Sequence, residues 1–417
     1  MRGISGSWLL IGDASPAIAR GAVLLDATER VLAVGSLDVL RREHPSVAFQ
    51  ELPAVLTPGL VNAHTHLELS GLRGRVPGGR GFVPWVDTLV RTRAQAKPEL
   101  DTEAIDEAIS ELLAAGVMGL GDVTNRLNTV PALAALPIAG CVFHEVFGMR
   151  RDTAEVTLGM AVQEREQFGP WPVQLRYALA PHTPFTLHPE ILREIALRCR
   201  AARARTSLHL CEHAAERAFL ESGGGPFREW IASRDASPLD WQPPACGSVE
   251  HVRRLGVLGP DVIVVHLTDA RPAEVQQLAA AGAPVVLCPR SNLHIELKLP
   301  PLLDILGAGI RPGLGTDSLA SNTSLDPLAE ARALAQRFPT VPAATLLAMA
   351  CAWGADALGL GRVLGRLQPG AFPGVLAFEH GASAPADPER YVIQSEPATR
   401  RIVSRPHYPS LPAEVFA

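Results

Sequence analysis

Lysine is nearly absent from this chain of 417 residues: only Lys97 and Lys298 occur, and arginine carries the remaining positive charge. The formal net charge is -5, which argues against a surface that binds nucleic acid. No apolar run reaches the roughly eighteen residues of a membrane span, and the N-terminus lacks the apolar core of a signal peptide. We therefore expect a cytoplasmic protein with a small-molecule substrate and no nucleic-acid or membrane partner, and we leave open that it forms a homodimer.

Two common sequence signatures are also missing. The six cysteines contain no Cys-x-x-Cys pair, which excludes a thiolate zinc site of that type and argues against a disulfide framework. No Gly-x-Gly-x-x-Gly follows an early apolar run, so the usual signal for a dinucleotide-binding fold is absent.

The distribution of apolar runs predicts two units. Residues 1–57 and 361–417 have short strand-like runs and prolines, and we expect them to form one small β-sandwich-like domain. Residues 58–360 alternate apolar runs with helix-like segments, which is typical of a (β/α)8 TIM barrel. An open doubly wound sheet is the alternative. The eight candidate strands are 60–66, 117–124, 138–147, 173–180, 206–211, 261–267, 284–289 and 311–316.

The first candidate strand ends in His64-Thr65-His66. Alternate side chains of a strand share a face, so both imidazoles can point to the same side while Thr65 turns away. Two imidazoles in this arrangement provide half of a metal site. A pair of ordinary histidines is the alternative, and His-x-His alone does not decide between the two.

Further polar side chains lie at the carboxyl ends of later strands, where the active site of a barrel is found. They are His182, His209 with Glu212, His266 and Asp317. Three neutral imidazoles and one carboxylate with an open position for water are typical of hydrolytic zinc, although iron or manganese accepts the same set. We predict His64, His66, His209 and Asp317 as the ligands, with bound water as the nucleophile.

The scarcity of lysine bears on the number of metal ions. In related barrels a carboxylated lysine at the end of strand four bridges two metals. Residues 173–180 contain no lysine. We therefore predict one divalent ion per chain, with Zn2+ expected and Fe2+ as the alternative.

Five motifs between residues 58 and 318 resemble those of the amidohydrolase superfamily, in its branch of mononuclear deaminases and chlorohydrolases. They are Pro-Gly-Leu-Val-Asn-Ala-His-Thr-His (58–66), Ala-Pro-His-Thr-Pro-Phe-Thr (180–186), His-Leu-Cys-Glu (209–212), Cys-Pro-Arg-Ser-Asn (288–292) and Gly-Thr-Asp-Ser (315–318). Each motif is weak alone, but together and in this order they are specific.

The resemblance implies a hydrolytic deaminase. Glu212 is expected to shuttle a proton from water to a ring nitrogen, His266 to hold that water, and Asp317 to act as both ligand and hydrogen-bond acceptor. His182 is expected to reach the substrate. The chemistry agrees, because hydroxide attack beside a ring nitrogen needs a carboxyl group that gives and takes protons.

Within this branch the motifs are most similar to those of the aminodeoxyfutalosine deaminases of the futalosine route to menaquinone. That resemblance implies conversion of 6-amino-6-deoxyfutalosine to futalosine. We expect Glu68 to accept hydrogen bonds from ribose, Trp85 either to stack on the heterocycle or to pack in the core, and an arginine to meet the substrate carboxylate. The candidate arginines are Arg73, Arg150, Arg151 and Arg290, and Arg290 follows a strand end directly.

Other functions stay open on the sequence alone. The same scaffold holds adenosine, methylthioadenosine, S-adenosylhomocysteine or guanine, and a chlorohydrolase acting on a heterocycle uses the same type of site. A non-catalytic barrel kept as a binding protein predicts eroded ligands, and none is eroded.

Overall fold

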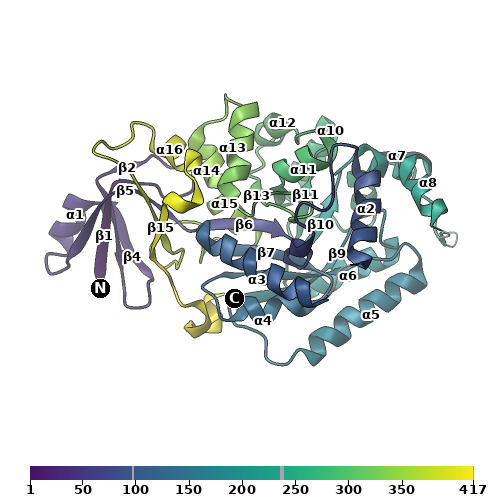
Figure 1. Ribbon diagram of the computed structural model, residues 1–417, viewed down its shortest axis with the longest axis horizontal. Helices are drawn as coiled ribbons and strands as arrows, with labels where there is room; N and C mark the ends of the chain where they lie inside the picture. The colour runs from purple at the N-terminus through teal and green to yellow at the C-terminus, as the bar shows by residue number, and fades with distance from the viewer. Residues whose placement is uncertain (96–97, 235–238, 417) are drawn as a thin grey trace.

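In the computed structural model, eight parallel strands surround the centre of the larger part of the molecule (Figure 1). The structure describes residues 1–416 apart from 96–97 and 235–238. Each strand overlaps one of the eight expected ranges. They are β6 (Leu60–Thr65), β7 (Val117–Thr124), β8 (Ala139–Val146), β9 (Leu175–Pro181), β10 (Thr206–Leu210), β11 (Val262–His266), β12 (Val285–Leu287) and β13 (Gly313–Leu314).

The strands form two halves, in the orders β6-β7-β8-β9 and β10-β11-β12-β13. Backbone contacts close the halves into a barrel: the amide of His209 donates to the carbonyl of His182 over 3.1 Å, and Thr65 forms a parallel bridge with Asp317. The expected TIM barrel is therefore confirmed, and the open sheet is excluded.

Helices cover the outside of the barrel, so the strands are buried on both faces. Every residue of β7 and β11 is buried, which explains their nearly continuous apolar sequences. The helices of this part are α2 (Phe82–Ala94), α3 (Pro98–Ala114), α4 (Val130–Ala134), α5 (Arg151–Gln167), α6 (Pro189–Ala201), α7 (Ala214–Ser222), α8 (Pro226–Ser233), α9 (Ser248–Arg254), α10 (Pro272–Ala281), α11 (Pro289–Glu296), α12 (Leu302–Gly307), α13 (Pro327–Arg337), α14 (Ala343–Met349) and α15 (Ala352–Ala357). Among the described residues, no helix combines the length and the apolarity required to cross a membrane.

Two local signals position the elements around the barrel mouth. Asp326 caps α13 by accepting from the amide of Leu328, with Pro327 in the first helical turn, and this ends the loop that carries Asp317. Helix α2 begins after Gly81, whose φ of 87° favours glycine, and the Glu296 carboxylate accepts from the Phe82 amide over 2.6 Å. These contacts fix α2 beside α11, next to the carboxyl ends of the strands.

Strands from both ends of the chain share a second sheet, which lies beside the barrel (Figure 1). Its order is β15-β14-β5-β1-β3-β4, and β2 pairs with β1. The strands are β1 (Arg2–Leu9), β2 (Ile18–Ala19), β3 (Gly21–Leu25), β4 (Val31–Ser36), β5 (Phe49–Pro58), β14 (Val375–Glu379) and β15 (Arg400–Ser404). Two further helices are α1 (Leu37–Glu43) and α16 (Pro388–Gln394).

The small sheet has an apolar cluster of its own, which includes Ile4, Val23, Leu56 and Val375. Strand β5 leads directly into β6 through Gly59. A Cβ atom at Gly59 would lie 2.3 Å from the Met118 side chain, so the close approach of the two parts requires glycine here. The small β domain of the expected fold is thus present, while the division of the chain at 57/58 and 360/361 stays a prediction.

Candidate active site

The end of β6 presents two imidazoles to the barrel axis. His64 and His66 are buried, and their ring centroids lie 5.0 Å apart at an angle of 79°. Thr65 between them turns away and donates its hydroxyl to the carbonyl of Asp317 over 3.1 Å. The alternation expected from the strand pattern therefore holds at these three residues.

The structure brings the four expected ligands together. The Nε2 atoms of His66 and His209 lie 3.3 Å apart, and one ligand atom from each of His64, His66 and His209 lies within 4.8 Å of the others. Asp317 Oδ1 is 3.6 Å from His66 Nε2 and 3.9 Å from His64 Nε2. These side chains come from β6, β10 and the loop after β13, and they meet because parallel strands end at the same face of a barrel.

Two serines orient the Asp317 carboxylate. Ser291 and Ser321 donate to Oδ2 over 2.6 and 2.8 Å, which leaves Oδ1 facing the histidines. Burial raises the pKa of Asp317, but His66, His266 and the Ser291 hydrogen bond outweigh it and hold this pKa below its usual value. The carboxylate is thus charged and aimed at the cluster.

The histidines of the cluster are neutral. Burial lowers the pKa of His66 to about 3 and holds those of His64 and His209 below the usual range. Neutral imidazole is the form that binds a metal ion. His64 Nε2 is buried and has no hydrogen-bond partner among the described residues, an arrangement that costs free energy unless an ion or a ligand meets it. The donor set therefore fits a divalent metal.

A carboxylic acid lies next to this cluster. Glu212 follows β10, is buried, and places Oε1 3.7 Å from His266 Nε2. Burial, followed by the charge of Asp317, raises the pKa of Glu212 well above its usual value. Glu216, which sequence reasoning missed, accepts from the amides of Cys211 and Glu212 over 2.9 Å each and fixes this turn.

His266 is held by an amide side chain. Asn292 donates its Nδ2 to His266 Nδ1 over 3.0 Å, so the imidazole proton resides on Nε2, the nitrogen that faces Glu212. Burial lowers the pKa of His266 to about 3. This side chain is therefore a neutral hydrogen-bond donor directed at the site.

Strain in the backbone coincides with the same strand ends. Cys211, His266, Leu267 and Asp317 have φ values of 52°, 80°, 58° and 55°, in the left-handed region that non-glycine residues rarely adopt. Such strain persists where the surrounding structure enforces it, and it gathers at functional sites.

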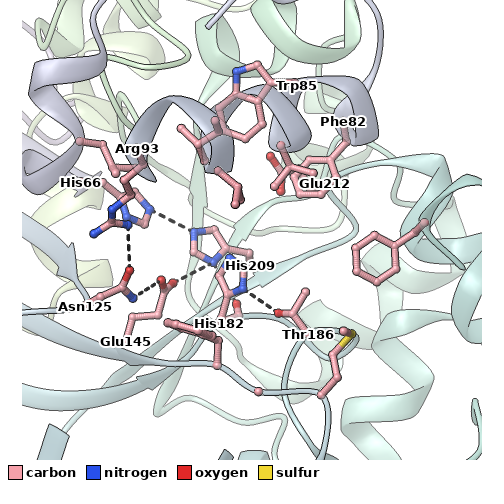
Figure 2. Close-up of a pocket in the computed structure, with 18 of the residues that line it drawn as sticks. His66, Phe82, Trp85, Arg93, Asn125, Glu145, His182, Thr186, His209 and Glu212 are labelled. Carbon is pink, nitrogen blue, oxygen red and sulfur yellow. Dashed lines mark hydrogen bonds and ion pairs between the residues drawn. The ribbon is translucent and has the colours of Figure 1, made fainter. Parts of the chain in front are cut away.

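A pocket of about 740 Å3 opens above the cluster. Its apolar side includes Phe82, Trp85 and Leu89 of α2 and Trp230 of α8, and His182 and Thr186 lie across from α2 (Figure 2). His182 Nδ1 is 2.6 Å from the Thr186 hydroxyl, and burial lowers the His182 pKa to about 4. Trp85 and His182 thus both line the pocket, as expected.

A polar wall forms another side of the pocket, and we use this name for Glu68, Arg93, Asn125 and Glu145. Arg93 donates to Asn125 Oδ1 over 3.1 Å, and Asn125 donates to Glu145 Oε2 over 3.0 Å (Figure 2). Arg93 also donates to Glu68 Oε1 over 3.0 Å. Only Glu68 was expected from the sequence. The other three are single polar residues on α2, after β7 and on β8, and no local pattern identifies them.

The arginines separate into two groups. Arg290 does not line the pocket: it donates to the Thr323 hydroxyl over 2.5 Å and lies 3.9 Å from Glu330, so the expectation that it faces the substrate is corrected here. The reason is the start of α11 at Pro289, because consecutive helix residues point in different directions and Ser291 and Asn292 take the inward ones.

The other three arginines also differ in their surroundings. Arg73 pairs with Glu111, and Arg151 pairs with Glu155 and Glu190. Arg150 lines the pocket beside Asp152, at 2.9 Å.

Comparison with known proteins agrees with this arrangement. The sequence model of the amidohydrolase family matches residues 55–386, and proteins of this family are metal-dependent. The chain is 29% identical to aminodeoxyfutalosine deaminase of Deinococcus radiodurans, over 79% of this chain and 80% of that protein. It is also 29% identical to a 5-methylthioadenosine/S-adenosylhomocysteine deaminase of Nitratidesulfovibrio vulgaris, over 88% of this chain and 80% of that protein.

A crystal structure of Helicobacter pylori aminofutalosine deaminase in complex with methylthio-coformycin has a similar fold. The TM-score is 0.85 with 22% sequence identity, covering 96% of this chain and all of the other. This similarity extends over both the barrel and the small sheet.

Proposed function

The chain belongs to the amidohydrolase family and is an enzyme that hydrolyses C–N bonds, and we propose that it deaminates an adenine nucleoside, with 6-amino-6-deoxyfutalosine as the substrate and futalosine as the product. The observation that carries the proposal is the buried Glu212 beside the histidine cluster, whose pKa burial raises well above its usual value, at the base of a mostly apolar pocket. The relatives with the same activity support it.

One divalent ion, Zn2+ before Fe2+, is held by His64, His66, His209 and Asp317 in this proposal. Such an ion, when bound, supplies Lewis acidity that lowers the pKa of water to about 7. The orphaned His64 Nε2 and the oriented Asp317 Oδ1 support this ligand set.

Glu212 moves the protons of the reaction. Its carboxyl group donates a proton to the ring nitrogen next to the amino-bearing carbon, and it takes up the proton that the attacking water releases. His266, with its proton on Nε2, donates a hydrogen bond to the attacking oxygen. Glu212 then passes that proton to the exocyclic amine, which leaves as ammonia, and takes up the proton of the added hydroxyl group, whose oxygen remains on the carbon as a carbonyl.

The pocket suits a nucleoside in size and polarity. Its volume lies within the range of roughly 300–1,000 Å3 that small-molecule sites occupy. Trp85 and Phe82 offer aromatic surface to the base, and His182 lies across from them. The ribose then faces the polar wall, which contains Glu68.

Arg150 meets the carboxylate of the substrate in this proposal. Of the four arginines considered from the sequence, it alone lines the pocket. A guanidinium group forms paired hydrogen bonds with a carboxylate, and Arg150 already forms such a contact with Asp152.

S-adenosylhomocysteine is the second candidate substrate, and the Arg150 and Asp152 pair favours it. An amino-acid end carries a carboxylate and an ammonium group, so it could satisfy both members of the pair. The similarity to the deaminases of methylthioadenosine and S-adenosylhomocysteine supports this alternative.

Ammonia release from zinc-loaded protein tests the proposal. The specificity constants for aminodeoxyfutalosine, adenosine, methylthioadenosine, S-adenosylhomocysteine and guanine are compared. We expect aminodeoxyfutalosine to give the highest value, which would support a role in menaquinone biosynthesis; we propose the cytoplasm as the compartment. A higher specificity constant for another compound would contradict the substrate assignment but leave the deaminase function supported. Release of no ammonia from any of these compounds would contradict both the substrate assignment and the deaminase function.

A further inference from the structure

Glu145 lines the pocket, and one of its carboxyl oxygens has no hydrogen-bond partner among the described residues. It lies on β8, and its side chain is 8% exposed. Oε2 accepts from Asn125, but Oε1 is buried and has no hydrogen-bond partner among the described residues. A buried acceptor without a partner costs free energy, so a group that donates to it is expected from a ligand.

The neighbouring His209 does not account for this atom. His209 Nδ1 already donates to the carbonyl of His182 over 2.9 Å, and that bond sets the direction of the ring. Glu145 Oε1 lies 3.6 Å from the same nitrogen, beyond hydrogen-bond distance. The carboxylate is therefore free to accept from another donor.

The polar wall fixes Glu145 while leaving Oε1 available. Arg93 bridges Asn125 and Glu68, and Asn125 in turn holds Glu145. Both oxygens of Glu68 have partners, since Oε1 accepts from Arg93 and Oε2 from the Thr124 hydroxyl over 3.0 Å. Of the two carboxylates in the wall, Glu145 is thus the one with an unmet acceptor.

The charge of the wall indicates the type of donor. Arg93, the guanidinium of the wall, already donates to Asn125 and Glu68, and burial raises the pKa of Glu145 to about 7, so the wall favours a neutral hydroxyl donor over a substrate carboxylate. The pocket thus offers this wall to the hydroxyls of a sugar and the apolar side of α2 to an aromatic base.

We propose that Glu145 Oε1 accepts a hydrogen bond from a ribose hydroxyl of the substrate, and that Arg93 and Asn125 position Glu145 for this contact. The inference rests on the proposed nucleoside substrate. It makes Glu145, in place of Glu68, the residue that distinguishes ribose from deoxyribose.

The experiment compares adenosine with 2′-deoxyadenosine and 3′-deoxyadenosine by kcat/KM in the zinc-loaded full-length protein. A hydrogen bond from a hydroxyl to a buried carboxyl oxygen that otherwise has no partner predicts that the wild type prefers adenosine over one of the two analogues by roughly tenfold to a hundredfold. Glu145→Leu should bring that ratio close to one. Glu145→Gln, which keeps the size of the side chain, should lower it less and serves if the leucine variant does not fold.

Glu68→Gln is the matched control, because it changes the other carboxylate of the same wall. We expect it to keep the ratio of the wild type within about twofold. A collapse of the ratio in Glu68→Gln with no change in Glu145→Leu assigns the contact to Glu68 and overturns the inference.

Metal content separates hydroxyl recognition from a supporting role toward His209. Elemental analysis should give the same zinc per chain in wild type and both Glu145 variants. A loss of zinc with an unchanged adenosine preference overturns the inference, because Glu145 then acts through the metal site.

Binding measured by calorimetry distinguishes failure of this inference from failure of the proposed function. If adenosine binds more tightly than its deoxy analogue but no ammonia is released, the proposed deaminase function is contradicted and the Glu145 contact is supported. Ammonia release with no preference for the hydroxyl contradicts the contact and keeps the deaminase, while no binding of any nucleoside contradicts both.

Discussion

Replacement of Glu212 by glutamine tests the central chemical step. Glutamine has nearly the shape of the protonated carboxyl group, which is the form that burial favours in Glu212. The variant should therefore fold and keep its metal, while it loses the ability to give and take a proton. A positioned acid and base contributes roughly 10²- to 10⁴-fold to a rate, so kcat should fall by at least about a hundredfold, or about 3 kcal/mol in the barrier.

Stability as a function of pH gives an independent measurement on the same variant. The pKa of Glu212 in the folded chain is raised above its value of 4.5 in the unfolded chain. Between these two values the folded state binds a proton that the unfolded state has lost, so this group's stabilising contribution is complete below pH 4.5 and is lost as the pH rises through the folded pKa. Glutamine does not ionise, so Glu212→Gln removes this loss. For the metal-free proteins, the Tm of the variant minus the Tm of the wild type should therefore increase between pH 5 and pH 8.

The assay combines turnover, zinc content and thermal unfolding. Near-full activity in Glu212→Gln would refute the proton-transfer role. A loss of zinc together with activity would instead show that Glu212 supports the ligands. A Tm difference that does not change with pH would contradict the raised pKa.

Three further predictions concern the metal and the arginines. Elemental analysis should find one tightly held metal per chain, and two would contradict the prediction of a single metal. His64→Ala should lose most of this metal, because a ligand atom with no other partner is removed, and retention would exclude His64 as a ligand. Arg150→Gln should lower kcat/KM by roughly tenfold for a nucleoside with a carboxylate and by less than about twofold for adenosine. Arg290→Gln is its control and should change neither, since Arg290 lies outside the pocket.

The barrel could be predicted from the sequence because its strands are buried on both faces. Such strands, for example β7 and β11, appear as apolar runs with polar residues at their ends. The length of β13 could not be predicted: only Gly313–Leu314 pair regularly, although the expected strand covers 311–316, because pairing depends on the neighbouring strand.

The expected ligands could be placed because each lies at a strand end, where the fold itself fixes direction. The polar wall could not be placed, since Arg93 of α2, Asn125 after β7 and Glu145 of β8 are far apart in the sequence and meet only through hydrogen bonds in the folded chain. The prediction that Arg290 faces the substrate was wrong for a related reason. Its motif follows a strand, but the next element is a helix, which turns the side chain outward. The position of a residue in the sequence thus predicts the direction of its side chain at a strand end and no longer does so once a helix has begun.

The contact between Arg150 and Asp152 predicts how the enzyme separates its two candidate substrates. A benzoate-bearing nucleoside brings only a carboxylate, so it must compete with Asp152 for the guanidinium. An amino-acid end brings an ammonium group that replaces the lost partner of Asp152. Asp152→Asn should therefore raise kcat/KM severalfold for aminodeoxyfutalosine and lower it for S-adenosylhomocysteine, with adenosine as the unaffected reference. Equal changes for all three compounds would show that Asp152 shapes the start of α5 and does not select the substrate. The role of Arg150 in binding a carboxylate would then be tested by Arg150→Gln alone.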